Sequence, residues 1–174
     1  LGQIDKAAPF IEQAVKADPQ SADAQYYLGL VRDEQGDARG ATEALLRSRA
    51  LDGARSAVVW SPSAEAFTAI VKGAIEKLDS VLGRYVREAE VYVVDLPGAE
   101  VVVDGVDPRA LLVLDTPPAE EGAPARVRAF IYQRNVERAA GSLEAMETEL
   151  AAALEREVTA VFLDGQKPDK SQLN

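Results

Sequence analysis

Hydrophobic residues recur at three- and four-residue steps in two stretches of the chain, which is the spacing of one face of an α-helix. The first stretch follows Ser63, a helix-capping residue, and ends at Gly83. Its apolar positions are Phe67, Ile70, Val71, Ala74, Ile75, Leu78 and Leu82. The second stretch follows Ser142. Its apolar positions are Leu143, Met146, Leu150, Leu154, Val158 and Val161. We therefore predict two amphipathic helices that bury these positions.

Three shorter runs between these helices are rich in β-branched and aromatic residues and are separated by Pro- and Gly-rich joints, as is typical of strands. They are EVYVVDL, ALLVLD and VRAFIYQ. Residues 99–105 (AEVVVDG) remain open, because they fit either the second strand of a hairpin or one helical turn between strands. The order of elements predicts an α+β fold with a small sheet packed by two helices.

The first part of the chain repeats itself at an offset of 34 residues. GQIDKAAPFIEQAVKADP from Gly2 aligns with GDARGATEALLRSRALDG from Gly36, and AQYYLGLVRDEQGD lies between them. Small residues at Gly29, Ala41 and Ser48 allow two antiparallel helices to approach closely. The pattern predicts a helical hairpin preceded by one more helix.

Residues 1–53 resemble one and a half tetratricopeptide repeats, a family with a 34-residue period. Gln25 and Gly53 depart from that family's usual residues. The resemblance implies a face that binds a peptide, with Tyr27 and Arg32 as candidate contacts. The alternative is a helix pair that only packs against or caps the rest of the protein.

The chain of 174 residues carries a net charge of -10 and contains no His and no Cys. Nucleic acid and anionic membranes are therefore not expected as partners, because Lys and Arg mediate both kinds of binding. Nucleophilic schemes that use Ser/His/Asp or Cys/His are excluded by composition. No apolar run approaches the roughly 18–20 residues that span a bilayer, and no signal-peptide pattern is visible. We expect a cytoplasmic protein and leave open what precedes Leu1.

Two further stretches, VVDLPGAEVVVDGVDPRALLVLD and FIYQRNVER, followed by a long helix, resemble the bacterial minimal zincin-like metallopeptidase family. The resemblance implies a last helix with the motif H-E-x-x-H-x-x-G-x-x-D, whose His residues bind zinc and whose Glu activates water. In LAAALEREVTAVFLDG the two His positions are Glu155 and Thr159, the base position is Arg156, and the final ligand position is Gly165. The resemblance therefore implies an inactivated peptidase with no catalytic residue, metal or cofactor.

These patterns divide the chain into four parts. They are tetratricopeptide-like helices (1–53), a linker (54–62), a degenerate zincin-like domain (63–166) and a polar tail (167–174). Our leading hypothesis is a non-catalytic scaffold that binds another protein or a peptide. The candidate contacts are Tyr27, Arg32, Arg126, Arg128, Arg134 and Arg156.

Two alternatives remain. One is a metal-dependent peptidase whose site is rebuilt from carboxylates or completed by a partner subunit. The other is a structural module that caps the repeats or forms a homodimer through an apolar edge strand. For the arginines at 126, 128, 134 and 138, ion pairing with neighbouring glutamates competes with a docking role.

Overall fold

The computed structural model describes residues 4–117 and 126–164. The chain forms two compact units, and each unit combines two separate stretches. Unit 1 comprises Leu1–Ala57 with Leu96–Ala110, and unit 2 comprises Val58–Asp95 with Leu111–Asn174. The sequence-based division had placed residues 96–110 in the second domain, whereas here they group with the N-terminal helices. None of the helices described is long and apolar enough to cross a membrane.

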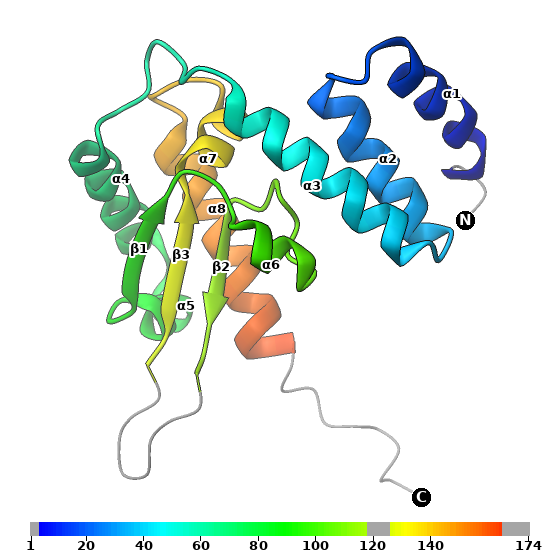
Figure 1. Cartoon of the computed structure of the whole chain (residues 1–174). Helices are drawn as coiled ribbons and strands as arrows, with labels where there is room; N and C mark the ends of the chain where they lie inside the picture. The colour runs from blue at the N-terminus through cyan, green and yellow to red at the C-terminus, as the bar shows by residue number, and fades with distance from the viewer. Residues whose placement is uncertain (1–3, 118–125, 165–174) are drawn as a thin grey trace, which may run out of the picture. The chain divides into compact units, whose positions relative to one another are not determined.

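In the described residues of unit 1, the regular structure consists of helices joined by turns and loops (Figure 1). Its helices are α1 (Ile4–Ala17), α2 (Ala22–Glu34), α3 (Ala38–Ala54) and α6 (Ala99–Val103). Helices α2 and α3 pack side by side around a turn in which Gly36 takes a left-handed φ of 78°. A Cβ atom added to Gly29 would lie 2.6 Å from Leu45 Cγ, and the buried Ser48 hydroxyl donates to the Ala22 carbonyl at 3.0 Å. The close approach predicted at small residues is confirmed.

The stretch from Leu96 to Ala110 packs against α3. Arg49 Nε of α3 donates to the carbonyl of Pro97 at 2.7 Å. The alternatives left open for residues 99–105 are decided in favour of a helix, α6. It ends where Gly105 takes φ of 100°, a left-handed conformation that glycine adopts without strain.

Unit 2 contains a three-stranded sheet and helices, and it confirms the predicted α+β fold. Its elements are α4 (Ala64–Lys77), α5 (Ser80–Val86), β1 (Glu90–Val94), β2 (Leu112–Asp115), β3 (Arg128–Tyr132), α7 (Gln133–Ala140), α8 (Met146–Val158) and a π-helical turn, η1 (Thr159–Leu163). The strand order is β1-β3-β2, with β1 parallel and β2 antiparallel to β3. Tyr92 and Val113 are the register partners of Phe130 from the two sides.

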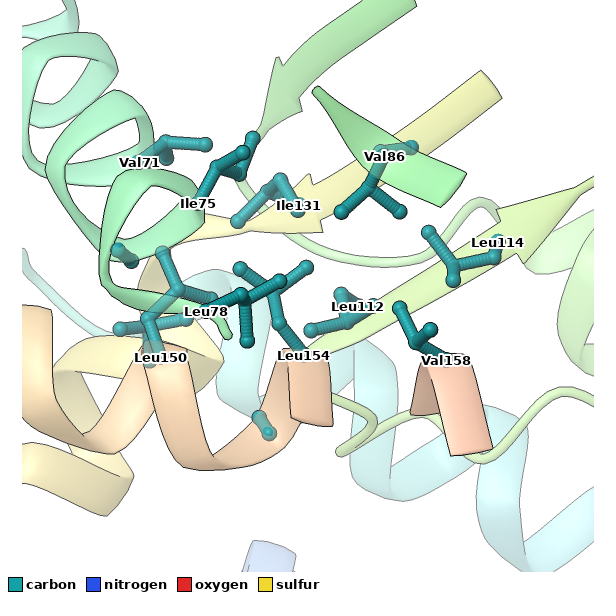
Figure 2. Close-up of a cluster of buried hydrophobic side chains, with 14 of the residues drawn as sticks. Val71, Ile75, Leu78, Val86, Leu112, Leu114, Ile131, Leu150, Leu154 and Val158 are labelled. Carbon is teal, nitrogen blue, oxygen red and sulfur yellow. The ribbon is translucent and has the colours of Figure 1, made fainter. Parts of the chain in front are cut away.

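The core of unit 2 lies between one face of the sheet and helices α4, α5 and α8 (Figures 1 and 2). Figure 2 labels ten of its buried side chains: Val71, Ile75, Leu78, Val86, Leu112, Leu114, Ile131, Leu150, Leu154 and Val158. All but Val86, Leu112, Leu114 and Ile131 belong to the two predicted helical stripes. Each fully buried side chain of this size contributes roughly 1.5–3 kcal/mol to the stability of the fold.

The predicted helix from Ser63 to Gly83 is wrong in one respect, because it consists of two helices. Ser63 caps α4 as predicted, with its hydroxyl accepting from the Ala66 N–H at 3.2 Å. The chain becomes extended at Leu78, and the carboxylate of Asp79 then caps α5. Gly83 lies inside α5 rather than at its end. The Asp79 carboxylate caps a new helix at this point. The apolar spacing continues across the junction, so the sequence pattern alone does not show the break.

The last helix is also shorter than predicted. Helix α8 begins at Met146, so Leu143 precedes it and is exposed. After Val158 the helix continues as the π-helical turn, and Val161 is exposed there as well. A π-helical turn has more residues per turn than an α-helix, so the residues that face the core change: Phe162 and Leu163 pack against it, and Val161 does not.

Candidate protein-interaction surface

Strand alternation gives unit 2 an outer sheet face, on the side opposite the core. Side chains of successive strand residues point to opposite faces, so Val91 and Val93 face the core while Tyr92 and Val94 face outward. We define the outer sheet face by its apolar residues, Tyr92, Val94, Val113 and Phe130. In Figure 1, helices α4, α5 and α8 lie behind the sheet, on its core face.

Two of these side chains are substantially exposed. The exposed fraction is 43% for Tyr92 and 41% for Val94. The rings of Tyr92 and Phe130 stack, with centroids 5.1 Å apart and an interplanar angle of 16°. Stacked aromatic rings form a rigid apolar surface that loses little side-chain entropy when a partner covers it.

A row of charged residues borders the apolar part of the outer sheet face. Glu90 accepts hydrogen bonds from the Tyr92 hydroxyl at 3.0 Å and from Arg126 Nη1 at 3.1 Å. These two bonds, the one from Tyr92 first, lower the pKa of Glu90 below its usual 4.5. Next along the row, Arg128 pairs with Asp115. The charges in this row are therefore balanced locally.

Strand β1 is an edge strand, and its backbone has a free side. The N–H of Glu90 donates to the carbonyl of Val127, just before β3. Because alternate residues of a strand point their backbone groups to opposite sides, the even-numbered residues of β1 are the ones that bond to β3. The N–H and C=O groups of Val91 and Val93 consequently point away from the sheet. Within residues 4–117 and 126–164 no hydrogen-bond partner is found for these four groups. Such an edge is a template for pairing with another extended segment.

Among the residues of unit 2 that the structure describes, cavities at two places have no lining residue among the apolar residues of the outer sheet face. One, of about 390 Å³, is lined by α4, α5 and α8 and includes Lys77, Leu82 and Glu155. Lys77 is paired there with Glu147 at 2.7 Å. The other, of about 400 Å³, lies at the start of β1 and includes Arg84 and Arg126. Each combines acidic and basic groups, so neither favours one sign of charge.

The positions aligned with the peptidase motif lie at the end of α8. Glu155 and Arg156 are exposed, and the hydroxyl of Thr159 donates to the carbonyl of Glu155 at 2.7 Å. Gly165 lies outside the described residues. In the part of the chain that the structure describes, no three His, Cys, Asp or Glu residues are grouped so as to hold a metal ion.

The arginines proposed as partner contacts do not gather in one place. Arg126 and Arg128 lie at the start of β3. Arg126 pairs with a glutamate, Glu90, as the ion-pairing interpretation expects, whereas Arg128 pairs with an aspartate, Asp115. Arg134 follows the other end of this five-residue strand, whose first and last residues are about 13 Å apart at the usual rise per residue. Arg156 lies on α8, which covers the core face.

In unit 1, the two proposed contacts differ in availability. Tyr27 is exposed on α2. Arg32 instead donates from Nη1 to the carbonyl of Gly40 at 3.1 Å and so supports the α2–α3 turn. Tyr27 is therefore an available surface residue, whereas Arg32 has a role within the fold.

Sequence reasoning missed the surface residues Tyr92 and Val94, and it also missed a buried cluster that positions α7. In that cluster the Glu137 carboxylate accepts from the Ser61 hydroxyl at 2.6 Å and from Gln133 Nε2 at 3.0 Å. The alternation of EVYVV did contain a signal, because it places Tyr92 and Val94 on one face. In comparisons with known proteins, no family model and no curated protein matched the chain.

Proposed function

We propose that the chain is a non-catalytic protein-interaction module, in which unit 2 binds an extended segment of a partner protein along β1. The observation that carries this proposal is the exposure of Tyr92 and Val94 on an edge strand with outward-pointing backbone groups. An added strand would satisfy the N–H and C=O groups of Val91 and Val93, and its own outward-facing side chains would lie beside Tyr92 and Val94.

The family resemblances are part of this proposal. The 34-residue offset and the close packing at Gly29 support a tetratricopeptide-like origin for residues 1–53. The stretches around the strands support a zincin-like origin for residues 63–166. We treat this domain as catalytically inactive because Glu155, Arg156 and Thr159 replace the family's zinc ligands and base.

The test is a capture experiment on the full chain with one exposed apolar residue changed at a time. Tyr92→Lys alters the outer sheet face, and Val81→Lys alters another exposed apolar site, on α5, as the matched control. We expect a cellular protein to be retained by the wild type and by Val81→Lys but lost with Tyr92→Lys. An extended peptide from that protein should then shift the NMR signals of the Val91 and Val93 amides.

Two results would contradict the proposal. Equal retention by Tyr92→Lys would place binding elsewhere on the chain, and the absence of any specifically retained protein would remove the binding function. Stoichiometric zinc in the purified protein would instead favour the alternative of a metal-dependent hydrolase.

A structural role is the second candidate, and one observation favours it. Residues 96–110 lie against α3, joined to it by the bond from Arg49 to Pro97, where a further helical repeat would otherwise stack. In this role the segment caps the hairpin. The measurement is the cellular abundance of the folded chain. Capping would be supported over partner binding if this abundance stays normal in Tyr92→Lys but is lost in Arg49→Ala.

A further inference from the structure

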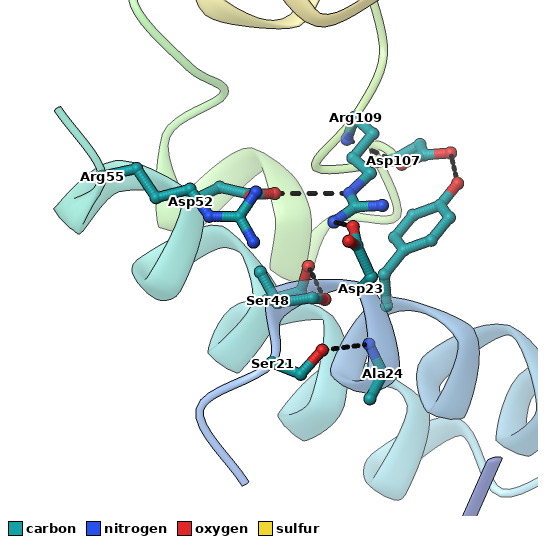
Figure 3. Close-up of polar contacts among 10 residues, drawn as sticks. Ser21, Asp23, Ala24, Ser48, Asp52, Arg55, Asp107 and Arg109 are labelled. Atoms are coloured by element: carbon teal, nitrogen blue, oxygen red, sulfur yellow. Dashed lines mark hydrogen bonds and ion pairs between the residues drawn. The ribbon is translucent and has the colours of Figure 1, made fainter. Parts of the chain in front are cut away.

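Arg109 joins the separate stretches of unit 1 through a site on α2 and α3 (Figure 3). Its Nε lies 3.3 Å from Asp52 Oδ2 of α3, and its Nη2 lies 2.6 Å from Asp23 Oδ1 of α2. Its guanidinium carbon lies 4.4 Å from the centroid of the Tyr26 ring. Two carboxylates and an aromatic face therefore surround one guanidinium group.

The site is largely closed to solvent. The side chain of Arg109 is 14% exposed and that of Asp52 is 3% exposed, whereas Asp23 lies at the open rim. Asp52 also pairs through Oδ1 with Arg55 at 3.4 Å, so its charge stays compensated on the α3 side. The buried Asp52 carboxylate therefore keeps one neighbouring cation when Arg109 is removed, which limits the cost of leaving its charge without Arg109.

The backbone of the turn that carries Arg109 is held as well. Asp107 Oδ1 accepts from the N–H of Arg109 at 2.7 Å, and Asp107 Oδ2 accepts from the Tyr26 hydroxyl at 2.7 Å. Burial, followed by this hydrogen bond, raises the pKa of Tyr26 above its ordinary value of 10.0. Tyr26 thus contacts residues 107–109 twice: its ring lies against the Arg109 guanidinium, and its hydroxyl donates to Asp107.

We infer that the α2–α3 hairpin carries an arginine-recognition site, formed by Asp23, Tyr26 and Asp52, and that Asp107-Pro108-Arg109 occupies it as a ligand supplied by the same chain. The chemical class that it takes is an arginine side chain on an Asp-Pro-Arg turn. The planar guanidinium satisfies the two carboxylates and the ring face together. A lysine ammonium is a point charge without the planar fork, so it fits the site less well. An anion would be repelled by the two carboxylates.

Occupation by the same chain closes the site to other polypeptides. A tethered ligand acts at an effective concentration in the millimolar range, so a free peptide of equal intrinsic affinity does not displace it. Removing the Arg109 side chain vacates its place between Asp23, Asp52 and the Tyr26 ring without changing these residues, while Asp107 keeps its bond to Tyr26. This site lies in unit 1, so its test is independent of the proposed surface on unit 2.

The experiment uses the full chain with Arg109→Ala and a capped peptide of residues 105–111, Gly-Val-Asp-Pro-Arg-Ala-Leu. The matched probe replaces its arginine by lysine. By calorimetric titration, Arg109→Ala should bind the arginine peptide at least about tenfold more tightly than the lysine peptide, and the wild type should bind neither. Adding Asp52→Asn to Arg109→Ala should weaken binding of the arginine peptide by at least about tenfold. Equal binding of the two peptides, or equal binding by the wild type, would overturn the inference.

Circular dichroism first establishes that Arg109→Ala is folded. If it is not, Arg109→Lys takes its place, because it keeps the positive charge but not the planar fork. The arginine peptide should then raise the Tm of Arg109→Lys progressively as its concentration increases above the Kd, while the Tm of the wild type stays unchanged. A Tm of Arg109→Lys that does not respond to the peptide contradicts the inference.

Discussion

Tyr92 and Glu90 lie two positions apart on the same face of β1, and a hydrogen bond of 3.0 Å joins their side chains. The bond favours the charged carboxylate and the neutral phenol, so it lowers the pKa of Glu90 and raises that of Tyr92. Because the pKa of Glu90 is lower in the folded than in the unfolded chain, its stabilising contribution is present above pH 4.5. That contribution is lost as the pH falls through the folded value.

We predict that Tyr92→Phe raises the pKa of Glu90 toward 4.5, because the larger of the two hydrogen-bond contributions is removed while Arg126 still donates. A pH titration of the Glu90 carboxyl carbon by NMR measures the change. Glu76, exposed on α4, serves as the reference carboxyl. If the pKa of Glu90 is the same in Tyr92→Phe as in the wild type, the hydrogen bond from the Tyr92 hydroxyl does not lower it.

Individual residue roles were predictable only where the partner lies nearby in the sequence. Ser63 was recognised as a cap because its partner, the N–H of Ala66, is three residues away. Arg109 was not recognised, because its partners Asp52 and Asp23 are 57 and 86 positions away. Nothing in the local sequence of an arginine specifies which distant carboxylate it will meet.

At the level of helices and strands, apolar periodicity identified which segments form regular structure but not where each one ends. The strands EVYVV, LVLD and RAFIY were predicted, and the stripe of α8 places Leu150 and Leu154 in the core. The junction between α4 and α5 was missed, because apolar spacing continues through Leu78 while Asp79 restarts the helix. Capping competes with periodicity at such points.

We predict that Asp79→Ala destabilises the chain by about 0.5–2 kcal/mol, the usual cost of losing an N-cap. Its carboxylate Oδ1 accepts from the N–H groups of Val81 at 2.7 Å and Leu82 at 3.0 Å, and alanine leaves both without this acceptor. Urea unfolding followed by circular dichroism gives the free energy. Ser80→Ala, at the exposed neighbouring position, is the control, and equal effects of the two substitutions would contradict a capping role.

At the scale of the whole molecule, the chain contains one natural fluorescent reporter of unfolding. Its single tryptophan, Trp60, packs against the core of unit 2. We predict that Leu154→Ala, at a fully buried position of that core, lowers the free energy of unfolding by about 2–5 kcal/mol. Trp60 fluorescence during urea unfolding detects this loss in unit 2.

The control for that measurement is Val59→Ala, next to the reporter but fully exposed. It should leave the unfolding midpoint unchanged, because no apolar contact is lost. A shift of similar size for Val59→Ala and Leu154→Ala would mean that the fluorescence reports the linker rather than the core.

The amino-acid order alone determined the features that depend on near neighbours: the amphipathic helices, the alternation of the strands and the close approach at Gly29. The three-dimensional fold decided the strand order β1-β3-β2, the free edge of β1 and the assignment of residues 96–110 to unit 1. The reason is physical. Periodicity records which side of an element is apolar, whereas pairing between distant segments depends on which surfaces complement one another once the elements have formed.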